Sequence, residues 1–342
     1  MQFAECRRLI ENCWLGHYYY HRIILEKSIR VFAPATVANV ACGFDIMGFA
    51  IEQPGDEVVM RLTSKAGEVS IERIVGDEGK LPLDPHKNTV SLVVQQLLHS
   101  LDSKHGASIT LYKNMPLGSG LGSSAASAVA GLFAANELLR RYEPHKALAE
   151  RVDLLPYAME GERLACGSAH ADNVAPALMG GFVLVRSYDP LDVITIPAPL
   201  SLWVTVIHPQ VEVQTRDARS ILRKQISLKD ATIQWGNTAG LVAGLWKCDY
   251  ELIGRSMQDV IIEPIRSILI PGFDNVKYNA MRAGALGCGI SGSGPSIFSL
   301  SRDEETAEEV GRKMQNAFGM LNIDSEVYIS PINREGPRIV HE

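Results

Sequence analysis

Apolar and polar residues follow two periodicities along the chain, one typical of strands and one typical of helices. Short runs that alternate or are rich in β-branched residues predict strands, at residues 29–32, 57–63, 68–74, 107–112, 181–187, 192–196, 202–207 and 296–300. Apolar residues that recur every three or four positions predict helices, at residues 88–101, 121–141, 145–164, 227–247, 250–259, 274–282 and 303–321. Because the strands do not alternate strictly with the helices, the pattern favours an α+β fold over a doubly wound parallel sheet.

The length of the chain and one segment within it indicate two domains. A chain of 342 residues is long for a single hydrophobic core. Residues 190–199 combine prolines with short apolar pieces, which is typical of a domain boundary. We therefore expect an N-terminal domain at residues 29–187 and a C-terminal domain at residues 188–342. Residues 1–28 lack the apolar region of a signal peptide, so we interpret them as an extension that need not be native, or else as a docking helix.

Composition and charge exclude several classes of partner. The formal net charge is -6, and acidic and basic residues are interspersed, so the chain lacks the basic face that nucleic acids require. The six cysteines have neither paired spacing nor neighbouring histidines, which indicates no zinc site and no disulfide framework and fits a reducing cytoplasm. No run of 18 or more apolar residues occurs, so no membrane span is predicted. We expect a cytoplasmic protein with a small-molecule ligand.

The glycine-rich segment at residues 114–130 carries the clearest chemistry. Gly118, Gly120 and Gly122 allow positive φ and close approach to a ligand, and an alanine-rich helix follows whose first amides are unpaired. This combination predicts a phosphate site, with a simple turn or helix-packing site as the alternative. A P-loop requires lysine after the last glycine, and the dinucleotide fingerprint requires glycine at position 123. Because Ser123 occupies that position, both motifs are excluded.

Two serines at the start of the predicted helix have two possible roles. Ser123 and Ser124 stand where N-cap and first-turn residues belong, so their hydroxyls can cap the helix. A hydroxyl beside a triphosphate can equally bind Mg²⁺, which takes one or two protein oxygens and keeps several waters. A carboxylate must then come from elsewhere, and Glu160 and Glu162 are candidates.

Two further loops concentrate small and polar residues. Residues 161–176 bring His170, Asp172 and Asn173 within four positions of one another, and loops of this kind hold functional residues more often than packing residues. Residues 287–296 form a second glycine-serine stretch, which leads into a strand. It is either a tight turn or a wall that supports the first loop.

Several segments, in family order, resemble the motifs of the GHMP small-molecule kinases, namely residues 33–45, 116–126 and 289–296. Within that superfamily the chain is similar to the homoserine kinase family through Asn39 to Asp45, His170-Ala-Asp-Asn173-Val-Ala-Pro, Thr215-Arg-Asp-Ala-Arg219 and Glu263-Pro-Ile-Arg266. The resemblance implies a two-domain fold with the active site in the cleft between the domains, and frequently a homodimer. It also implies ATP- and Mg²⁺-dependent phosphorylation of the side-chain hydroxyl of L-homoserine to O-phospho-L-homoserine, on the route to threonine.

The resemblance further implies roles for residues at the matching positions. The nucleotide would contact Asn88, Val90, Pro116, Leu117, Gly118, Ser119, Gly120, Leu121, Gly122, Ser123, Ser124, Ala125 and Ala126. The wall supporting that site would consist of Gly289, Ser291, Gly292, Ser293 and Gly294. Mg²⁺ would be held by Ser124 and Glu162. The substrate would be bound by Asn39, Asp45, His170, Arg219 and Arg266, and the catalytic residues would be Asn173, Asp172 and Thr215.

The chemistry of these residues agrees with those roles independently. A zwitterionic amino acid needs an anion at one end and guanidinium forks at the other, which Asp45 and the pair Arg219 and Arg266 would provide. Phosphoryl transfer requires mainly positioning and charge neutralisation. Mevalonate-type members carry a lysine in the first motif that supports a catalytic aspartate, whereas this chain has Thr36. That departure favours a mechanism in which Asn173 orients the hydroxyl, and it leaves Asp172 open as a base.

Two other functions are compatible with the same loops. One is a catalytically silent nucleotide sensor on the same fold, which the presence of Ser124, Glu162 and Asn173 opposes. The other is a kinase for a different small alcohol, such as a mevalonate-pathway intermediate or a sugar. Asp45 and the two arginines oppose a neutral sugar, because it offers no zwitterion to match.

Overall fold

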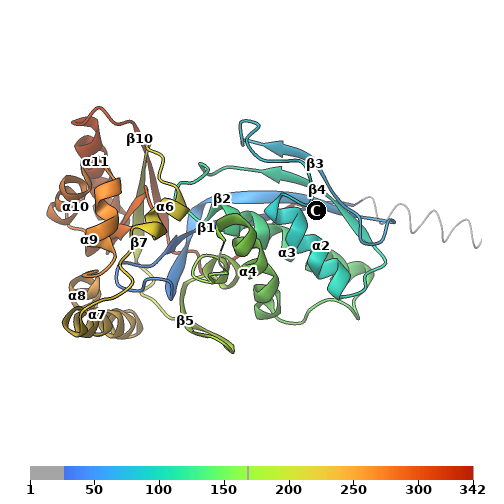
Figure 1. The fold of residues 1–342 in the computed structure, drawn as a ribbon, viewed down its shortest axis with the longest axis horizontal. Helices are drawn as coiled ribbons and strands as arrows, with labels where there is room; N and C mark the ends of the chain where they lie inside the picture. The colour runs from blue at the N-terminus through green and yellow to red at the C-terminus, as the bar shows by residue number, and fades with distance from the viewer. Residues whose placement is uncertain (1–26, 168, 342) are drawn as a thin grey trace, which may run out of the picture.

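The computed structural model describes residues 27–167 and 169–341. The expected N-terminal extension therefore lies outside the described residues, apart from its last two positions. Helices and two largely antiparallel sheets are layered side by side along the long axis of the molecule, which confirms the α+β fold (Figure 1).

The larger sheet is built around one long central strand. Its members are β1 (Ile29–Ala38), β2 (Met47–Thr63), β3 (Val69–Val75), β4 (Gly106–Tyr112), β5 (Phe182–Tyr188), β6 (Leu191–Ile196) and β11 (Arg338–His341). The order is β11-β1-β2-β4-β3, and β5 joins the other end of β2 to β6. Only the β3–β4 pair is parallel in the described residues. Alternate residues of β2 (Val58, Met60, Leu62) are buried, because successive side chains of a strand point to opposite faces.

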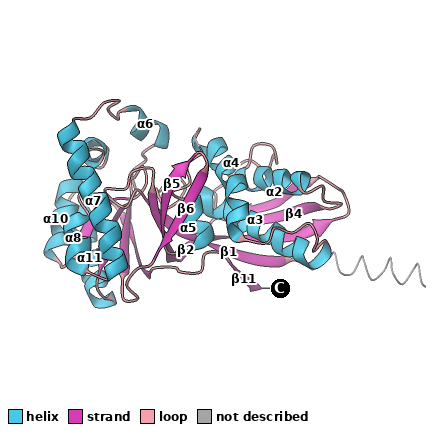
Figure 2. Cartoon of the chain, turned by 90° about the horizontal axis from the view of Figure 1, so that it is seen from below, coloured by secondary structure: helices cyan, strands magenta, loops and turns pink. Residues whose placement is uncertain are grey.

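Helices cover one face of this sheet (Figure 2). They are α2 (Thr89–Ser100), α3 (Ser123–Tyr142), α4 (Leu155–Cys166), α5 (Val174–Met179) and the 3-10 turn η1 (Arg151–Leu154). Helix α3 packs against β1 and β2, and its alanines are buried through most of its length. Small side chains let the helix backbone approach the sheet closely. The chain just before α3 therefore lies against β1, where the amide of Thr36 donates to the carbonyl of Leu121.

The smaller sheet has the order β10-β7-β9-β8. Its strands are β7 (Trp203–Pro209), β8 (Gly287–Ile290), β9 (Ile297–Ser301) and β10 (Ser325–Pro331). The accompanying helices are α6 (Thr215–Ser220), α7 (Leu228–Lys247), α8 (Tyr250–Ser256), α9 (Glu263–Arg266), η2 (Ser267–Leu269), α10 (Phe273–Arg282) and α11 (Glu304–Gly319). A second core cluster, which includes Ile207, Phe273, Val276, Met314 and Phe318, lies between this sheet and α10 and α11.

An aromatic contact joins the two sheets. Phe49 of β2 lies 4.6 Å from Phe182 of β5 and 5.8 Å from Phe298 of β9, measured between ring centroids. All three side chains are fully buried, and Phe298 belongs to the same core cluster as the larger sheet. The two sheets therefore share apolar packing, which fixes the relative position of the loops that extend from them.

Four predicted elements differ from the observed ones by three residues or more, and one of them is β1, which continues to Ala38 instead of ending at residue 32. Strand β2 starts at Met47, well before the predicted start at residue 57, because Pro54 and Gly55 lie inside the strand opposite a register shift in β1. The predicted helix at residues 145–164 is wrong at its start, because Pro156 occupies the first turn of α4 and η1 precedes it. The predicted helix at residues 250–259 ends earlier, at Ser256.

Several elements were not predicted, and all of them except β10, which has seven residues, are too short for a periodic pattern to register. They are α5, α6, α9, β8, β10 and β11. Strand β6 pairs with β5 in the larger sheet, and β11 returns from the far end of the chain to β1. The domain division at residue 188 stays a prediction. Within the described part of the chain, no helix combines the length and apolar character needed to cross a lipid bilayer.

Candidate active site

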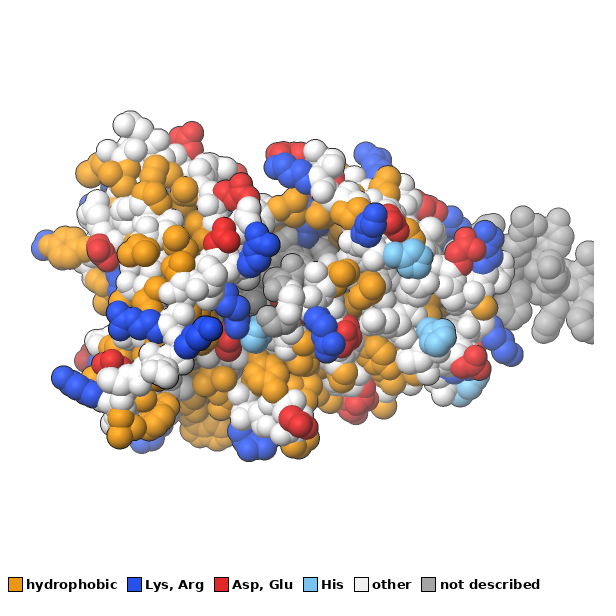
Figure 3. All heavy atoms as spheres, viewed as in Figure 1, with side chains coloured by type: hydrophobic (Ala, Val, Ile, Leu, Met, Phe, Trp, Pro, Cys, Tyr) orange, Lys and Arg blue, Asp and Glu red, His pale blue; other side chains and the backbone are white. Residues whose placement is uncertain are grey.

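A cavity of about 650 Å³ lies between the two halves of the molecule, where the surface is hollowed and basic side chains gather (Figure 3). Its walls come from both halves. The lining residues are Asn39, Asp45, Leu81, Pro82, Lys87, Asn88, Thr89, Leu111, Lys113, Leu117, Gly118, Ser119, Gly120, Gly122, Ser123, Ser124, Ser127, Glu162, His170, Asp172, Asn173, Thr215, Arg216, Arg219, Ser220, Arg266, Gly292 and Ser293.

The glycine-rich loop forms one wall of this cavity. Gly118, Gly120 and Gly122 have φ of 67°, 80° and 67°, in the left-handed region that favours glycine. A Cβ on Gly122 would lie 2.1 Å from Oγ1 of Thr36, so no larger residue fits there. Gly122 is also the N-cap of α3 and forms no side-chain cap, so the first amides of α3 have no intrahelical acceptor at the cavity wall. These amides and the positive end of the helix dipole suit an anion.

A buried ion pair lies beneath that first turn of α3. The ammonium of Lys113 pairs with Oδ2 of Asp56, and the two side chains are 2% and 0% exposed. Lys113 also donates to the carbonyl of Ser123 (3.0 Å) and to Oγ of Ser127 (2.8 Å), while both serine hydroxyls donate to Asp56 (3.0 and 2.9 Å). The hydroxyl of Ser123 is thus held by Asp56 and does not cap the helix. The network fixes the geometry of this first turn.

The second glycine-serine loop braces the first. Ser291 Oγ donates to the carbonyl of Gly120 (2.6 Å), and the amide of Ser296 donates to the carbonyl of Ser119 (3.3 Å). A Cβ on Gly120 would lie 2.5 Å from the carbonyl oxygen of Ser291, so the two backbones touch directly. The role of the second loop as a supporting wall stays a prediction. Ser119 Oγ is buried without a hydrogen-bond partner at this junction.

Asp45 and Arg219 define the opposite end of the cavity. Nη2 of Arg219 lies 2.8 and 3.0 Å from the two carboxylate oxygens of Asp45. Asn39 orients Asp45, because its Oδ1 accepts from the Asp45 amide (3.1 Å) while its Nδ2 donates to the carbonyl of Gly292 (2.7 Å). Asn39 and Asp45 adopt positive φ of 72° and 59°, which these residue types tolerate. Nδ1 of His170 lies 3.9 Å from Asp45, and burial lowers the pKa of this histidine.

Arg266 is the buried arginine of this end, with 4% exposure. Its Nε donates to the carbonyl of Ala218 (3.2 Å) and its Nη1 to the carbonyl of Gly292 (3.0 Å). The ring of Phe44 lies under both guanidinium groups, 5.1 Å from Arg266 and 5.6 Å from Arg219. Phe44 therefore holds the two arginines side by side through cation–π contacts.

Asn173 lies against the glycine-rich loop, beside Gly122, and its neighbour Asp172 lies toward the Asp45 end of the cavity. Oγ1 of Thr36 donates to Oδ1 of Asn173 (2.8 Å), which leaves the Asn173 amide nitrogen to donate elsewhere. Burial, and secondarily the charge of Asp45, raise the pKa of Asp172 to about 7. Thr215 Oγ1 lies 3.1 Å from Oγ of Ser293, so α6 touches the supporting loop.

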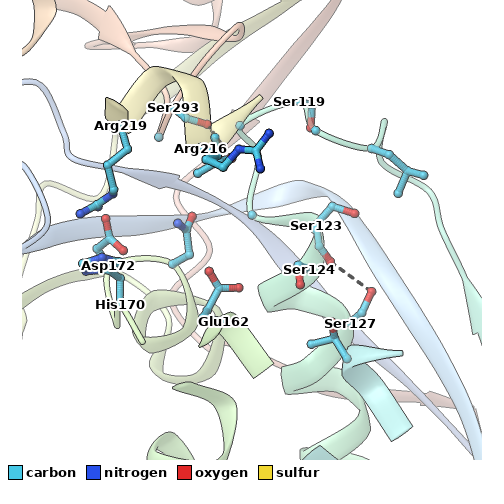
Figure 4. Close-up of a pocket in the computed structure, with 18 of the residues that line it drawn as sticks. Ser119, Ser123, Ser124, Ser127, Glu162, His170, Asp172, Arg216, Arg219 and Ser293 are labelled. Atoms are coloured by element: carbon cyan, nitrogen blue, oxygen red, sulfur yellow. Dashed lines mark hydrogen bonds between the residues drawn. The ribbon is translucent and has the colours of Figure 1, made fainter. Parts of the chain in front are cut away.

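An oxygen donor set suitable for Mg²⁺ is present in the same cavity. Ser124 and Glu162 both line it, and Glu162 is 7% exposed (Figure 4). Glu160 does not line the cavity and pairs instead with Arg163 at 2.9 Å, which separates the two candidate carboxylates. No group of three or more histidine, cysteine or acidic residues that could hold a metal occurs among the residues described here. One hydroxyl and one carboxylate fit an ion that keeps several waters.

Most of the expected site residues lie in this one cavity, and some do not. The exceptions among the expected contacts are Val90, Pro116, Leu121, Ala125, Ala126, Gly289, Ser291 and Gly294. Val90, Leu121, Ala125 and Ala126 are fully buried, because their side chains point into the core. The amide of Val90 donates to Oδ1 of Asn88, so Asn88 caps α2.

Sequence reasoning missed several residues that line the cavity. They are Leu81, Pro82, Lys87, Thr89, Leu111, Lys113, Ser127, Arg216 and Ser220. A detectable signal existed for Arg216, because it lies inside the Thr215 to Arg219 segment. No signal in the sequence marked Lys113, because its partner Asp56 lies 57 positions away, on strand β2.

The chain is similar to known proteins over most of its length. The family models for the GHMP kinases N terminal domain and the GHMP kinases C terminal match residues 88–181 and 241–319. The chain is 53% identical to a homoserine kinase of Chlorobium phaeobacteroides and 51% identical to one of Chloroherpeton thalassium, with 92% of this chain and 100% of each relative covered. A crystal structure of homoserine kinase from Cytophaga hutchinsonii superposes with a TM-score of 0.88 at 60% identity, covering 92% of this chain and 98% of that one. A mevalonate kinase from L. major shares the fold, with a TM-score of 0.66 at 14% identity over 88% of this chain and 95% of that one.

Proposed function

The chain belongs to the homoserine kinase family of the GHMP kinases, and we propose that its cavity holds the ATP phosphates at the glycine-rich loop and L-homoserine at the Asp45 end. The enzyme phosphorylates the side-chain hydroxyl of L-homoserine with ATP, giving O-phospho-L-homoserine for threonine biosynthesis. One observation carries the assignment of the two ends. A carboxylate and two guanidinium groups lie in the same cavity as an anion-binding helix start.

The substrate end suits a zwitterion. The Asp45 carboxylate would bind the ammonium group of homoserine, and Arg219 and Arg266 would bind its carboxylate. Asn39 keeps Asp45 in place through the Asp45 amide, and the ring of Phe44 contacts both arginines. The side chain of the substrate would then extend toward Asn173, which lies against the glycine-rich loop. A neutral sugar or a mevalonate-pathway alcohol lacks the ammonium group that Asp45 would match.

The nucleotide end suits a triphosphate. The amides of residues 117–124, which include the start of α3, would bind the phosphate oxygens, and Pro116, which has no N–H, would only shape the start of this loop. Lys113 and Asp56 hold this turn rigid from below. Asn88 would border the adenine together with Leu81 and Pro82, which line the same region. Val90 would support that border from beneath, because its buried side chain anchors α2 and its amide fixes Asn88.

Ser124 and Glu162 would hold Mg²⁺ between these two ends. When bound there, the ion neutralises charge on the phosphate chain as the phosphoryl group is transferred.

The residues between the two ends would then direct the reaction. Thr36 fixes the Asn173 amide so that its nitrogen can donate to the homoserine hydroxyl oxygen and hold a lone pair toward the γ-phosphorus. That lone pair forms the new O–P bond, and the electron pair of the breaking P–O bond goes to the β-phosphate oxygen of ADP. The hydroxyl proton passes to the Asp172 carboxylate, whose pKa of about 7 suits proton acceptance near neutral pH. Thr215 would help position the phosphoryl oxygens beside Ser293.

The remaining expectations on assembly and setting are also proposals. We propose a homodimer in the cytoplasm. Exposed apolar residues on α7, among them Leu228, Trp235 and Trp246, support self-association, because they are 75%, 62% and 68% exposed.

The substrate assignment is tested by ADP release with Mg-ATP across a panel of alcohols. We expect rapid release with L-homoserine and far slower release with L-threonine, mevalonate and a hexose. ATP binding without homoserine-dependent release would indicate a nucleotide sensor, and preference for mevalonate would indicate a different acceptor. Either result would refute the proposed substrate.

A further inference from the structure

Helix α6 presents one face to the cavity. Thr215, Arg216, Arg219 and Ser220 all line it, and their spacing of one, four and five positions places them on the same side of a helix. The helix is held in place over the cavity by Ala218, which is buried and whose carbonyl accepts from Nε of Arg266 (3.2 Å). Its side chains therefore reach the cavity from a fixed base.

The two arginines of α6 point to different ends of the cavity (Figure 4). Arg219 lies beside Asp172 and His170 and is paired with Asp45. Arg216 extends the other way, between Ser293 and the loop that carries Ser119 and Ser123. Arg216 is thus directed at the phosphate end, where Arg219 is directed at the substrate end.

Arg216 differs from the other cations that line the cavity in the partners of its positive charge. Lys113 is neutralised by buried Asp56, and Arg219 by Asp45. Arg266 is buried and bonded to two carbonyl groups. Lys87 has its carboxylate partner Asp84 at 3.6 Å. Nε of Arg216 lies 4.0 Å from Oδ1 of its sequence neighbour Asp217, and the Arg216 side chain is 87% exposed. Arg216 is therefore available to an incoming anion.

We propose that Arg216 is a catalytic residue that binds the phosphoryl group in transit from ATP to homoserine. This inference rests on the proposed function. As the homoserine oxygen bonds to the γ-phosphorus and the old P–O electron pair moves to ADP, negative charge is spread over the equatorial phosphoryl oxygens. The guanidinium donates hydrogen bonds to those oxygens, forms no covalent bond and moves no proton. Arginine suits this task because its planar fork matches phosphate and stays charged.

Steady-state kinetics separate this role from substrate binding. We expect Arg216→Ala to lower kcat about 10- to 1000-fold, since arginines that stabilise phosphoryl transfer can contribute even more, while the KM for homoserine changes less than about twofold. Arg216→Lys keeps the positive charge but loses the planar guanidinium group, so its kcat is expected to lie between those of wild type and Arg216→Ala. Added guanidinium is expected to restore part of the turnover of Arg216→Ala. Arg223→Ala is the matched control, because Arg223 is exposed just beyond α6 and does not line the cavity.

Nucleotide binding provides a readout that does not depend on homoserine. Binding of ADP and of a non-hydrolysable imido analogue of ATP would be measured by calorimetry with Mg²⁺ present. We expect Arg216→Ala to weaken the analogue about tenfold and ADP less than about twofold, because only the analogue carries the third phosphate. Equal losses for both nucleotides, or an unchanged affinity for the analogue, would overturn the proposal.

Two kinetic outcomes would also overturn it. A raised homoserine KM with unchanged kcat would assign Arg216 to the substrate carboxylate, and kinetics equal to those of Arg223→Ala would remove it from the site. If the wild-type enzyme showed no homoserine-dependent turnover, the proposed function would fail. The affinities for ADP and for the ATP analogue would still decide whether Arg216 binds the third phosphate.

Discussion

Asp45 and Arg219 form an ion pair across the substrate end of the cavity, with Nη2 of Arg219 2.8 and 3.0 Å from the two carboxylate oxygens. These groups are the ones that we expect to bind the ammonium and the carboxylate of homoserine. Their mutual contact therefore neutralises both charges before the substrate arrives. When homoserine binds, this one ion pair would be replaced by two, one between Asp45 and the ammonium group and one between Arg219 and the carboxylate. The contact also holds α6 against the larger half of the molecule.

We predict that Asp45→Asn weakens homoserine binding selectively. The amide keeps the size of the side chain but loses the charge-assisted bond, whose loss costs about 1.5 to 3 kcal/mol. The homoserine KM should therefore rise about 10- to 100-fold. Calorimetry should show the affinity for ADP unchanged within about twofold, because Asp45 lies at the other end of the cavity. A parallel loss of nucleotide affinity would show that Asp45 acts on the whole site.

The buried pair of Lys113 and Asp56 predicts a large effect on stability. Lys113→Met leaves the Asp56 carboxylate buried without its cation, which we expect to lower the free energy of unfolding by about 3 to 5 kcal/mol. Urea unfolding measures this. Lys65→Met is the control, because Lys65 pairs with Glu68 on the surface, with 70% and 57% exposure, and should change stability by less than about 1 kcal/mol. Similar small losses for both variants would contradict a supporting role for Lys113.

Glu162 and Glu160 provide a matched pair for the metal site. Glu162→Gln should lower kcat about 100-fold or more, because it removes a carboxylate from the proposed Mg²⁺ site. Titration of ADP binding with Mg²⁺ should show a weaker dependence on the ion. Glu160→Gln breaks only an ion pair with Arg163 outside the cavity and should leave both measurements nearly unchanged. If the two variants behave alike, Glu162 holds no metal.

The raised pKa of Asp172 predicts a pH-dependent stability. Burial, and secondarily Asp45, raise that pKa from 3.8 to about 7 in the folded protein. Between about pH 4 and pH 7 the folded protein therefore binds more protons than the unfolded chain, so this group lowers stability as pH rises through that window. Asp172→Asn cannot ionise and escapes this loss.

Thermal or denaturant unfolding of wild type and Asp172→Asn across pH 4 to 8 tests that sign. The free energy of unfolding of Asp172→Asn, measured relative to that of wild type, should rise by up to about 4 kcal/mol as pH rises through this range. A constant difference across this range would show that the pKa of Asp172 is not raised on folding, and a shift in favour of wild type would show that folding stabilises the carboxylate.

Local signals in the sequence singled out the glycine-rich loop, which lines one wall of the cavity. Gly118, Gly120 and Gly122 require backbone conformations that other residues avoid, and the alanines that follow permit close packing of α3 on the sheet, so both features are visible in one segment. Asp45 and Arg219 lie 174 positions apart, and only the resemblance to a family brought them together before the fold was known.

Features that depend on tertiary contact were not predictable from local patterns. An aspartate within β2 and a lysine beyond β4 carry no sign that they will pair beneath α3. Helix α6 has only six residues, too few for a periodic signal, so the direction in which Arg216 points could not be foreseen. Strand β11 joins β1 across nearly the whole chain, which no local pattern encodes.

Discrimination between homoserine and its two truncated analogues tests the central claim most directly. The wild-type value of kcat/KM would be compared for L-homoserine, 3-amino-1-propanol, which lacks the carboxylate, and 4-hydroxybutyrate, which lacks the amino group. We predict that each analogue loses about 100-fold or more in wild type. In Arg266→Ala, homoserine should lose most of its advantage over 3-amino-1-propanol but keep its advantage over 4-hydroxybutyrate. Equal kcat/KM values for all three alcohols in wild type would contradict a cavity built to hold a zwitterion against the phosphates of ATP.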